Sequence, residues 1–296
     1  MIGRTSALIL AFLLSGCAAL RLGSEPVDKI RTDPCAGGSA LPAKLLEPGG
    51  TLLFGEIHGT QELPGFFVEA VCWASGALPV QVGLEVSKSE QERIETFLAS
   101  AGAAADVEAM TAGPFWTGFQ DGRKSRAMVA LLDRLRRLRK EGRPIEVFLF
   151  VGDSEDMAEH DRMMADAIAA RVRAHPEALT MVLTGNIHAQ KNKGVPWNPD
   201  LVPMGWYLAD AGVRVIALNH STPAGTTWSC YPGPPLDCGR YPMRATAPLP
   251  SGRTIGIELL AEPTKEGFDG LYALPTLTAS PPALQAVTAA TEESRP

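Results

Sequence analysis

Several signatures of common protein classes are absent from this 296-residue chain. It has no Gly-x-Ser-x-Gly elbow, which disfavours a serine hydrolase, and neither a phosphate-binding loop nor a dinucleotide-binding fingerprint. Its cysteines lack the close Cys-x-x-Cys spacing that structural zinc sites usually show. The net charge is −6, and the single basic run, Arg134 to Lys140, has leucines at helical spacing. These features argue against nucleic acid as a partner.

The N-terminus reads as an export signal. An apolar run, Ala7 to Leu14, follows Arg4 and is too short for a membrane-spanning helix. The next string, Leu-Ser-Gly-Cys ending at Cys17, resembles the lipobox of bacterial lipoproteins. That resemblance implies cleavage before Cys17 and acylation of this cysteine. Because Ala18 rather than Asp follows, it also implies a lipid anchor in the outer membrane, with the body of the protein facing the periplasm. The alternatives are a secretory signal cut elsewhere or a buried N-terminal helix.

We expect four segments along the chain. Residues 1–16 would be the signal peptide and residues 17–45 a lipidated tether. Residues 46–274 are long enough for a single α/β domain with a substantial core. Residues 275–296, rich in Pro, Ala, Thr and Glu, read as a disordered tail.

Four further cysteines are disulfide candidates in an exported chain, and four cysteines allow three pairings. Cys230 with Cys238 is the first choice, because the turn-rich residues between them close easily. Cys35 with Cys72 would then tie the N-terminal segment to the first helix. A zinc site is the weaker alternative.

Apolar runs and helical patterns alternate over most of the chain. This alternation predicts a single α/β domain with a mostly parallel central sheet and helices on both faces. The expected strands are Thr51–Gly55, Val80–Leu84, Ile145–Val151, Thr180–Thr184, Val213–Leu218 and Thr254–Leu259. The expected helices are Glu62–Trp73, Ser89–Leu98, Ser125–Arg139, Asp156–Arg173 and Met204–Ala209. Residues 221–253, rich in Pro, Gly and Thr, are expected to form a long, ordered loop.

Two short strings repeat a Gly-x-x-His pattern directly after apolar runs. They are Gly55 to His58 and Gly185 to His188. Ligands of open parallel sheets bind beyond the carboxyl ends of the strands, so polar residues at those ends predict a site. The residues expected there are Glu56, His58, Glu85, Asp153, Asn186, His188, Asn219 and His220. Asp153 has the simpler explanation of a helix cap and His220 that of an exposed loop residue, and His160 is expected at the surface.

Glu56, His58, Glu85 and His188 carry the chemistry in this set, because they abut the most apolar segments and a charge there must be paired or functional. Carboxylates and imidazoles can activate water and stabilise an oxyanion. His58, Glu56 and His188 could equally bind a divalent metal such as Mn, Zn or Co. The sequence leaves these two alternatives open.

An ordered series of motifs over residues 50–220 resembles the superfamily of ChaN haem-uptake lipoproteins, Tiki and TraB proteins, and erythromycin esterases. The motifs are GEIHGTQE, VGLEVSKSEQ, HDRMMADAI, TGNIHAQKNKGVPW and MGWYL. The resemblance implies an α/β fold and marks Glu56, His58, Glu85 and His188 as the central site. Arg162 is a secondary candidate.

Two functions follow as expectations. The first is a hydrolase of a small ester, lactone or peptide-like bond, with His58 as general base assisted by Glu56 and Glu85, and with His188 stabilising charge. The second, implied by the ChaN resemblance, is a haem- or iron-binding protein that holds its ligand between two copies of the chain. Tyr207, Tyr231 or Tyr241 would then supply a phenolate ligand.

Overall fold

The computed structural model describes residues 35, 41–152, 159–231, 233 and 237–284. The expected signal peptide, Cys17 and Asp153 lie outside these residues. No helix in the described ranges is long and apolar enough to cross a membrane.

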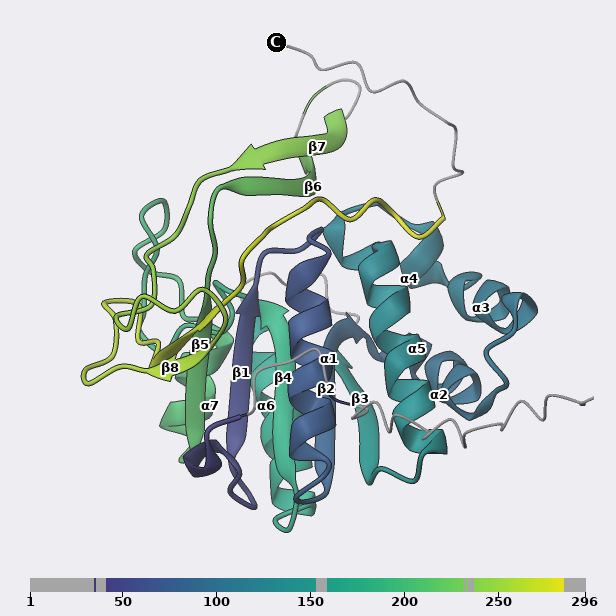
Figure 1. The fold of residues 1–296 in the computed structure, drawn as a ribbon, viewed down its shortest axis with the longest axis horizontal. Helices are drawn as coiled ribbons and strands as arrows, with labels where there is room; N and C mark the ends of the chain where they lie inside the picture. Colours follow the sequence, from purple (N-terminus) through teal and green to yellow (C-terminus); the bar gives the residue numbers. More distant parts are fainter. Residues whose placement is uncertain (1–34, 36–40, 153–158, 232, 234–236, 285–296) are drawn as a thin grey trace, which may run out of the picture. The chain divides into compact units, whose positions relative to one another are not determined.

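The described part of the chain is built on a seven-stranded sheet with strand order β3-β2-β4-β1-β5-β9-β8 (Figure 1). Every neighbouring pair is parallel except β8 with β9. The strands are β1 (Thr51–Glu56), β2 (Val80–Ser87), β3 (Ile145–Val151), β4 (Leu179–Gly185), β5 (Val215–Ser221), β8 (Gly256–Leu259) and β9 (Gly270–Ala273). The predicted class, an α/β domain with a mostly parallel central sheet, is confirmed.

Helices cover both faces of the sheet (Figure 1). One face carries α1 (Glu62–Ala74), α2 (Gln91–Ala99) and α5 (Arg126–Lys140), and the other carries α6 (His160–Ala174) and α7 (Met204–Asp210). Successive residues of β1 alternate between these layers, since Leu52 and Phe54 join the first core cluster and Leu53 joins the second. Both faces of β1 are therefore buried, which explains its unbroken apolar sequence.

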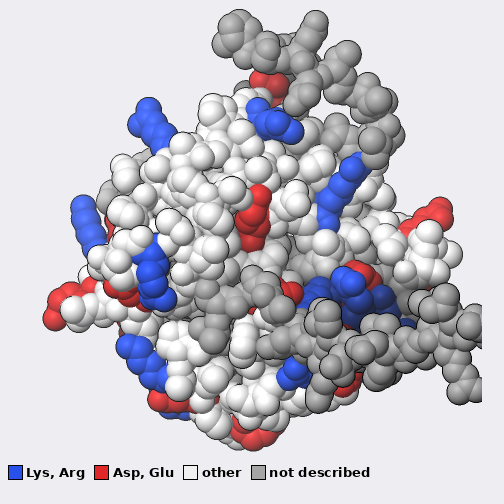
Figure 2. Space-filling view, viewed as in Figure 1, with Lys and Arg blue, Asp and Glu red and all other residues white. Residues whose placement is uncertain are grey.

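The basic run of α5 is a helix surface, as the leucine spacing predicted. Leu131, Leu135 and Leu138 are buried against the sheet. Ion pairs with carboxylates are made by Arg134, Arg136, Arg137 and Arg139 of this helix, among them Arg134 with Glu69 at 3.0 Å. Figure 2 likewise shows Lys and Arg side chains interspersed with Asp and Glu on the face in view.

The edge strand β3 has its open backbone groups covered by side chains. The Gln91 side-chain amide donates to the carbonyl of Val147 at 3.0 Å and accepts from the N–H of Leu149 at 2.9 Å. Arg139 donates to the carbonyl of Ile145 at 3.0 Å. This covering protects a strand that would otherwise offer its free edge to another chain.

Residues 221–253 differ most from expectation. Instead of one long loop they include an antiparallel hairpin of β6 (Gly225–Tyr231) and β7 (Asp237–Met243), which forms a separate two-stranded sheet. Elements not predicted from the sequence are η1 (Ala43–Leu45), η2 (Lys88–Glu90), α3 (Ala104–Thr111), α4 (Pro114–Thr117), η3 (Gly122–Lys124), β6, β7 and β9.

Packed residues extend beyond both ends of the segment expected to form the domain. Leu41 and Leu45 are buried in the core, although they were expected in the tether. Residues 277–282 were expected in the disordered tail, yet Ala279 forms a β-bridge with Thr60 and Ser280 is only 2% exposed. Their backbone groups are paired with loops of the domain, which composition alone does not reveal. Both predicted disulfides, Cys35–Cys72 and Cys230–Cys238, are present.

Candidate functional site

The two Gly-x-x-His strings lie side by side at the carboxyl edge of the sheet. Strands β1 and β4 are parallel neighbours, and their register places Gly55 opposite Thr184 and Glu56 opposite Gly185. Each strand ends at this point, and each histidine follows within the next three residues. The repeat in the sequence is therefore a repeat in space.

His58 lies between two buried carboxylates. Its Nδ1 is 2.9 Å from Glu56 Oε1 and its Nε2 is 3.5 Å from Glu85 Oε1. The second oxygen of Glu56 is buried without a hydrogen-bond partner among the described atoms. The His58 side chain keeps 28% of its surface exposed, so a ligand can reach the imidazole.

Glu85 reaches this position from the far side of β4. Its Oε2 accepts hydrogen bonds from Thr184 Oγ1 and from the Gly185 backbone N–H, both at 2.7 Å. Oε1 is left to face the histidines, and Arg123 Nη1 lies 3.5 Å from the same oxygen. Arg123 is itself held by Asp121 at 2.8 Å.

His188 forms a second imidazole–carboxylate pair. Its Nδ1 is 2.8 Å from Asp161 Oδ1, in the first turn of α6, and the same oxygen accepts the backbone N–H of Met204 at 2.7 Å. The Nε2 of His188 is 4.0 Å from Glu85 Oε1. Each histidine thus has its own carboxylate at Nδ1, and Glu85 stands between the two Nε2 atoms.

Gly185 separates the two imidazoles. A Cβ at this position would lie 3.0 Å from His58 Nε2 and 3.4 Å from Cδ2 of His188. The absence of a side chain at Gly185 therefore lets both rings lie close to the end of β4.

The charges of the site shift its pKa values strongly. Burial disfavours the protonated form of His58, but Glu85 and Glu56 outweigh burial and raise its pKa to about 10. Burial likewise opposes ionisation of Glu85, whereas His58 and His188 hold the pKa of this carboxyl well below its usual range. For His188, burial is outweighed by Glu85 and Asp161, so its pKa is raised as well.

The structure brings together the four central residues predicted from the sequence, and it adds Asp161 and Arg123. Asp161 stands in the HDRMMADAI motif, where its place in the first turn of a helix was the available signal. Its neighbour Arg162, the predicted secondary candidate, is exposed. Arg123 follows no strand and fits no motif, so local sequence offers no signal for it.

Other residues expected near the strand ends have different surroundings. His220 is buried rather than exposed, and burial lowers its pKa to about 4. Asn219 lies within β5, opposite Gly55. His160 is half-buried, with its ring centroid 6.0 Å from that of His188.

The tyrosines proposed as haem ligands stand on two different elements, α7 and the β6–β7 hairpin. Tyr207 packs on α7 at the second core cluster. Tyr231 is 53% exposed in the hairpin, where its ring meets that of Tyr241 edge-on at 4.6 Å.

The described residues contain no group of three or more His, Cys, Asp or Glu arranged to hold a metal ion. Both ring nitrogens of His58 face carboxylates. The metal set His58, Glu56 and His188 stays a prediction.

Comparison with solved structures shows the fold that this site occupies. A mutant of erythromycin esterase EreC in its open conformation matches with a TM-score of 0.60 and 14% identity, over 79% of this chain and 92% of the esterase. The chain has the fold of this esterase. A succinoglycan biosynthesis protein matches at 0.59 and 9%, over 80% of this chain and 90% of that one.

A third match to the esterase-like fold is a Bacillus cereus protein with a TM-score of 0.53 and 11% identity, covering 81% of this chain and 91% of its own. No protein-family profile and no curated protein sequence matches the chain. The fold implied by the motif resemblance is therefore confirmed by structural likeness.

Proposed function

We propose that this protein hydrolyses neutral esters or lactones, and that the bond to be cleaved is bound between the side chains of His58 and His188. The observation that carries the proposal is the pair of imidazole–carboxylate contacts that face each other across Gly185, with Glu85 between them. Such pairs orient an imidazole and fix which nitrogen holds the proton. The esterase-like fold supports the same reaction class.

The reaction needs a base and a charge stabiliser, and the two histidines supply them. Neutral His58 takes a proton from water as the water oxygen bonds to the carbonyl carbon, and protonated His188 stabilises the oxyanion that forms. The C–O bond to the leaving group then breaks, and His58 returns its proton to the departing oxygen. The products are a carboxylic acid and an alcohol, or one hydroxy acid from a lactone.

The balance of charges around the site favours a neutral substrate. His58, His188 and Arg123 face Glu56, Glu85, Asp161 and Asp121, so positive and negative groups are nearly balanced around the site. A strongly anionic or cationic substrate would find no excess of opposite charge there.

The pH profile distinguishes this mechanism from others. With the pKa of His58 at about 10, only about one molecule in a thousand holds the base form at pH 7. We therefore expect kcat/KM to rise above pH 7 by about tenfold per pH unit for as long as His188, whose pKa is also raised, keeps its proton, and to level off once His188 loses it. The His58→Gln variant lacks the titrating group and should show no such rise.

The test uses the full chain with p-nitrophenyl acetate and with small aliphatic lactones. We expect His58→Gln and His188→Gln to lower kcat/KM by about 10²- to 10⁴-fold. His175→Gln is the matched control, since His175 pairs with Glu177 outside the site and should keep full turnover. Folded variants at 58 and 188 that retain wild-type turnover would refute the mechanism. Failure of the wild-type protein to cleave p-nitrophenyl acetate and the lactones would also refute it.

Haem or iron binding stays a second proposal, from the ChaN resemblance. The exposed ring of Tyr231 is open to a ligand held between two copies of the chain. Titration of the protein with haemin should then shift the Soret band at a fixed stoichiometry and produce a dimer, and the Tyr231→Phe variant should weaken both effects. A spectrum identical to that of free haemin would rule this function out.

A further inference from the structure

The hairpin β6–β7 packs on the loop that carries His58. Figure 1 shows the two strands beyond the carboxyl end of β1. Thr227 is only 5% exposed, and its Oγ1 donates to the backbone carbonyl of His58 at 2.6 Å. The next residue, Trp228, donates its backbone N–H to the carbonyl of Gly59 at 2.9 Å.

Close backbone packing leaves this loop little freedom. Gly59 has a φ of 76°, and any Cβ there would clash with the carbonyl oxygen of Trp228. A Cβ on Gly122 would lie 2.6 Å from the carbonyl carbon of His58. The hairpin, the His58 loop and the η3 turn therefore lie in direct backbone contact.

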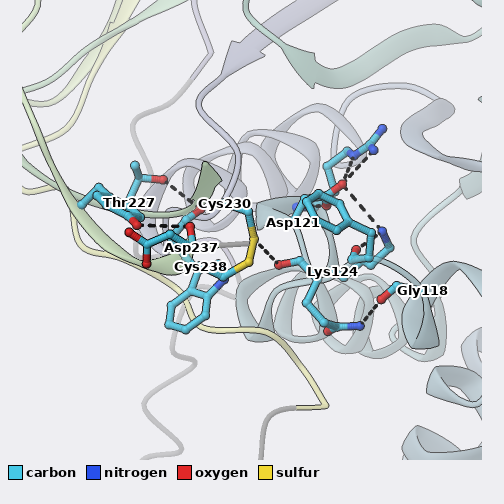
Figure 3. The surroundings of a disulfide bond; sticks show 12 residues. Gly118, Asp121, Lys124, Thr227, Cys230, Asp237 and Cys238 are labelled. Atoms are coloured by element: carbon cyan, nitrogen blue, oxygen red, sulfur yellow. Dashed lines mark hydrogen bonds and ion pairs between the residues drawn. A yellow bond between two sulfur atoms is a disulfide. The ribbon is translucent and has the colours of Figure 1, made fainter. Parts of the chain in front are cut away.

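The hairpin is cross-linked by the disulfide Cys230–Cys238, which Figure 3 shows between Thr227 and Asp121. The two cysteines are directly opposite each other in the hairpin, three residues beyond Thr227. Cys230 Sγ is 3.4 Å from the carbonyl oxygen of Gln120, in the loop that leads to Asp121 and Arg123. The hairpin thus contacts both the loop of His58 and the loop whose arginine faces Glu85.

A two-stranded hairpin is marginally stable on its own, so its shape depends on such a cross-link. We propose that Thr227 is a positioning residue, which the Cys230–Cys238 hairpin holds against the His58 carbonyl so that the imidazole stays between Glu56 and Glu85. This inference rests on the proposed function in that it gives His58 the reacting role. It concerns the placement of that residue and is independent of the substrate.

The first test replaces the hydroxyl at position 227. Thr227→Val keeps the shape but loses the donor, whereas Thr227→Ser keeps the donor. The readout is the proton NMR signal of His58 Nδ1–H in the full chain, assigned by its loss in His58→Gln. We expect the exchange of this proton with water to become at least tenfold faster in Thr227→Val and to stay at the wild-type rate in Thr227→Ser.

The second test removes the cross-link. The double variant Cys230→Ser/Cys238→Ser should reproduce the faster exchange. The matched control, Cys35→Ser/Cys72→Ser, removes the disulfide that ties residue 35 to α1 and should leave the His58 signal unchanged, even where it lowers the melting temperature. Circular dichroism confirms that each variant is folded.

The outcomes separate this inference from the proposed function. Exchange at the wild-type rate in both Thr227→Val and the Cys230/Cys238 variant overturns the inference, whatever the turnover. Equal effects of the two disulfide variants overturn it too, because they would indicate general loosening. If the variants show faster exchange but the wild-type protein hydrolyses none of the substrates, the placement of His58 by Thr227 is supported and the hydrolase function is rejected.

Discussion

At the scale of single residues, the site depends on how one carboxylate is shared. Glu85 Oε2 is fully engaged by Thr184 and the Gly185 backbone, so only Oε1 is free to face the histidines. Because this oxygen lies 3.5 Å from His58 and 4.0 Å from His188, it stabilises a proton on either ring. One buried acid thereby raises the pKa of both imidazoles, together with Glu56 at His58 and Asp161 at His188.

Gly185→Ala tests the space between those imidazoles. The added methyl group would lie 3.0 Å from His58 Nε2, so we expect it to exclude the substrate carbonyl and lower kcat/KM by at least about 100-fold. The loss of unfolding free energy should be only about 1 to 3 kcal/mol, as for other overpacked sites. Steady-state kinetics and urea unfolding measure the two effects.

The control for this substitution is Gly65→Ala, in α1. A Cβ there meets no atom within 4 Å. Because alanine is the better helix former, this variant should be more stable by up to about 1 kcal/mol at unchanged activity. Wild-type activity in a folded Gly185→Ala protein would show that the reaction takes place elsewhere.

At the scale of helices and strands, regular patterns were predictable and irregular ones were not. Ile145–Val151 was predicted with its observed bounds, because seven residues of mostly apolar, β-favouring sequence have no helical reading of comparable quality. The hairpin was missed because proline and glycine interrupt its sequence, and its pairing depends on a disulfide and on contacts with distant loops. Strand β9 has only four residues, too few for a periodic signal.

The same contrast holds for the site. Glu56, His58 and His188 follow apolar strands, and this local signal was enough to predict them. Asp161 contacts His188 from the first turn of α6, and this pairing appears only once β4 and α6 are packed together. Arg123 is placed near Glu85 by the η3 turn, which packs closely on the backbone of Gly59. The positions of Asp161 and Arg123 therefore depend on tertiary packing.

At the scale of the whole molecule, the site makes stability depend on pH. His58 has its pKa raised from 6.5 to about 10 in the folded state, so the folded protein binds this proton more tightly than the unfolded chain. The contribution of protonated His58 to the free energy of unfolding is complete below pH 6.5 and is lost as pH rises from 6.5 through about 10. The raised pKa of His188 acts in the same direction.

Acid erodes stability through other groups. His220 has its pKa lowered to about 4 by burial, so its contribution is complete above pH 6.5 and is lost as pH falls from 6.5 towards 4. The lowered pKa of Glu85 contributes stability above its ordinary value of 4.5 that is lost as pH falls further. The free energy of unfolding should therefore be greatest near pH 6.5.

Urea unfolding between pH 5 and pH 9 under non-reducing conditions tests this balance. From pH 7 to pH 9 we expect the free energy of unfolding to fall by up to about 1.4 kcal/mol per pH unit for each histidine that retains its proton. His58→Gln should reduce this alkaline slope, whereas His220→Gln should reduce only the slope on the acid side. A free energy that stays constant or rises between pH 7 and pH 9 in the wild type would mean that His58 does not hold its proton between Glu56 and Glu85. The placement of the imidazole on which the proposed reaction depends would then be wrong.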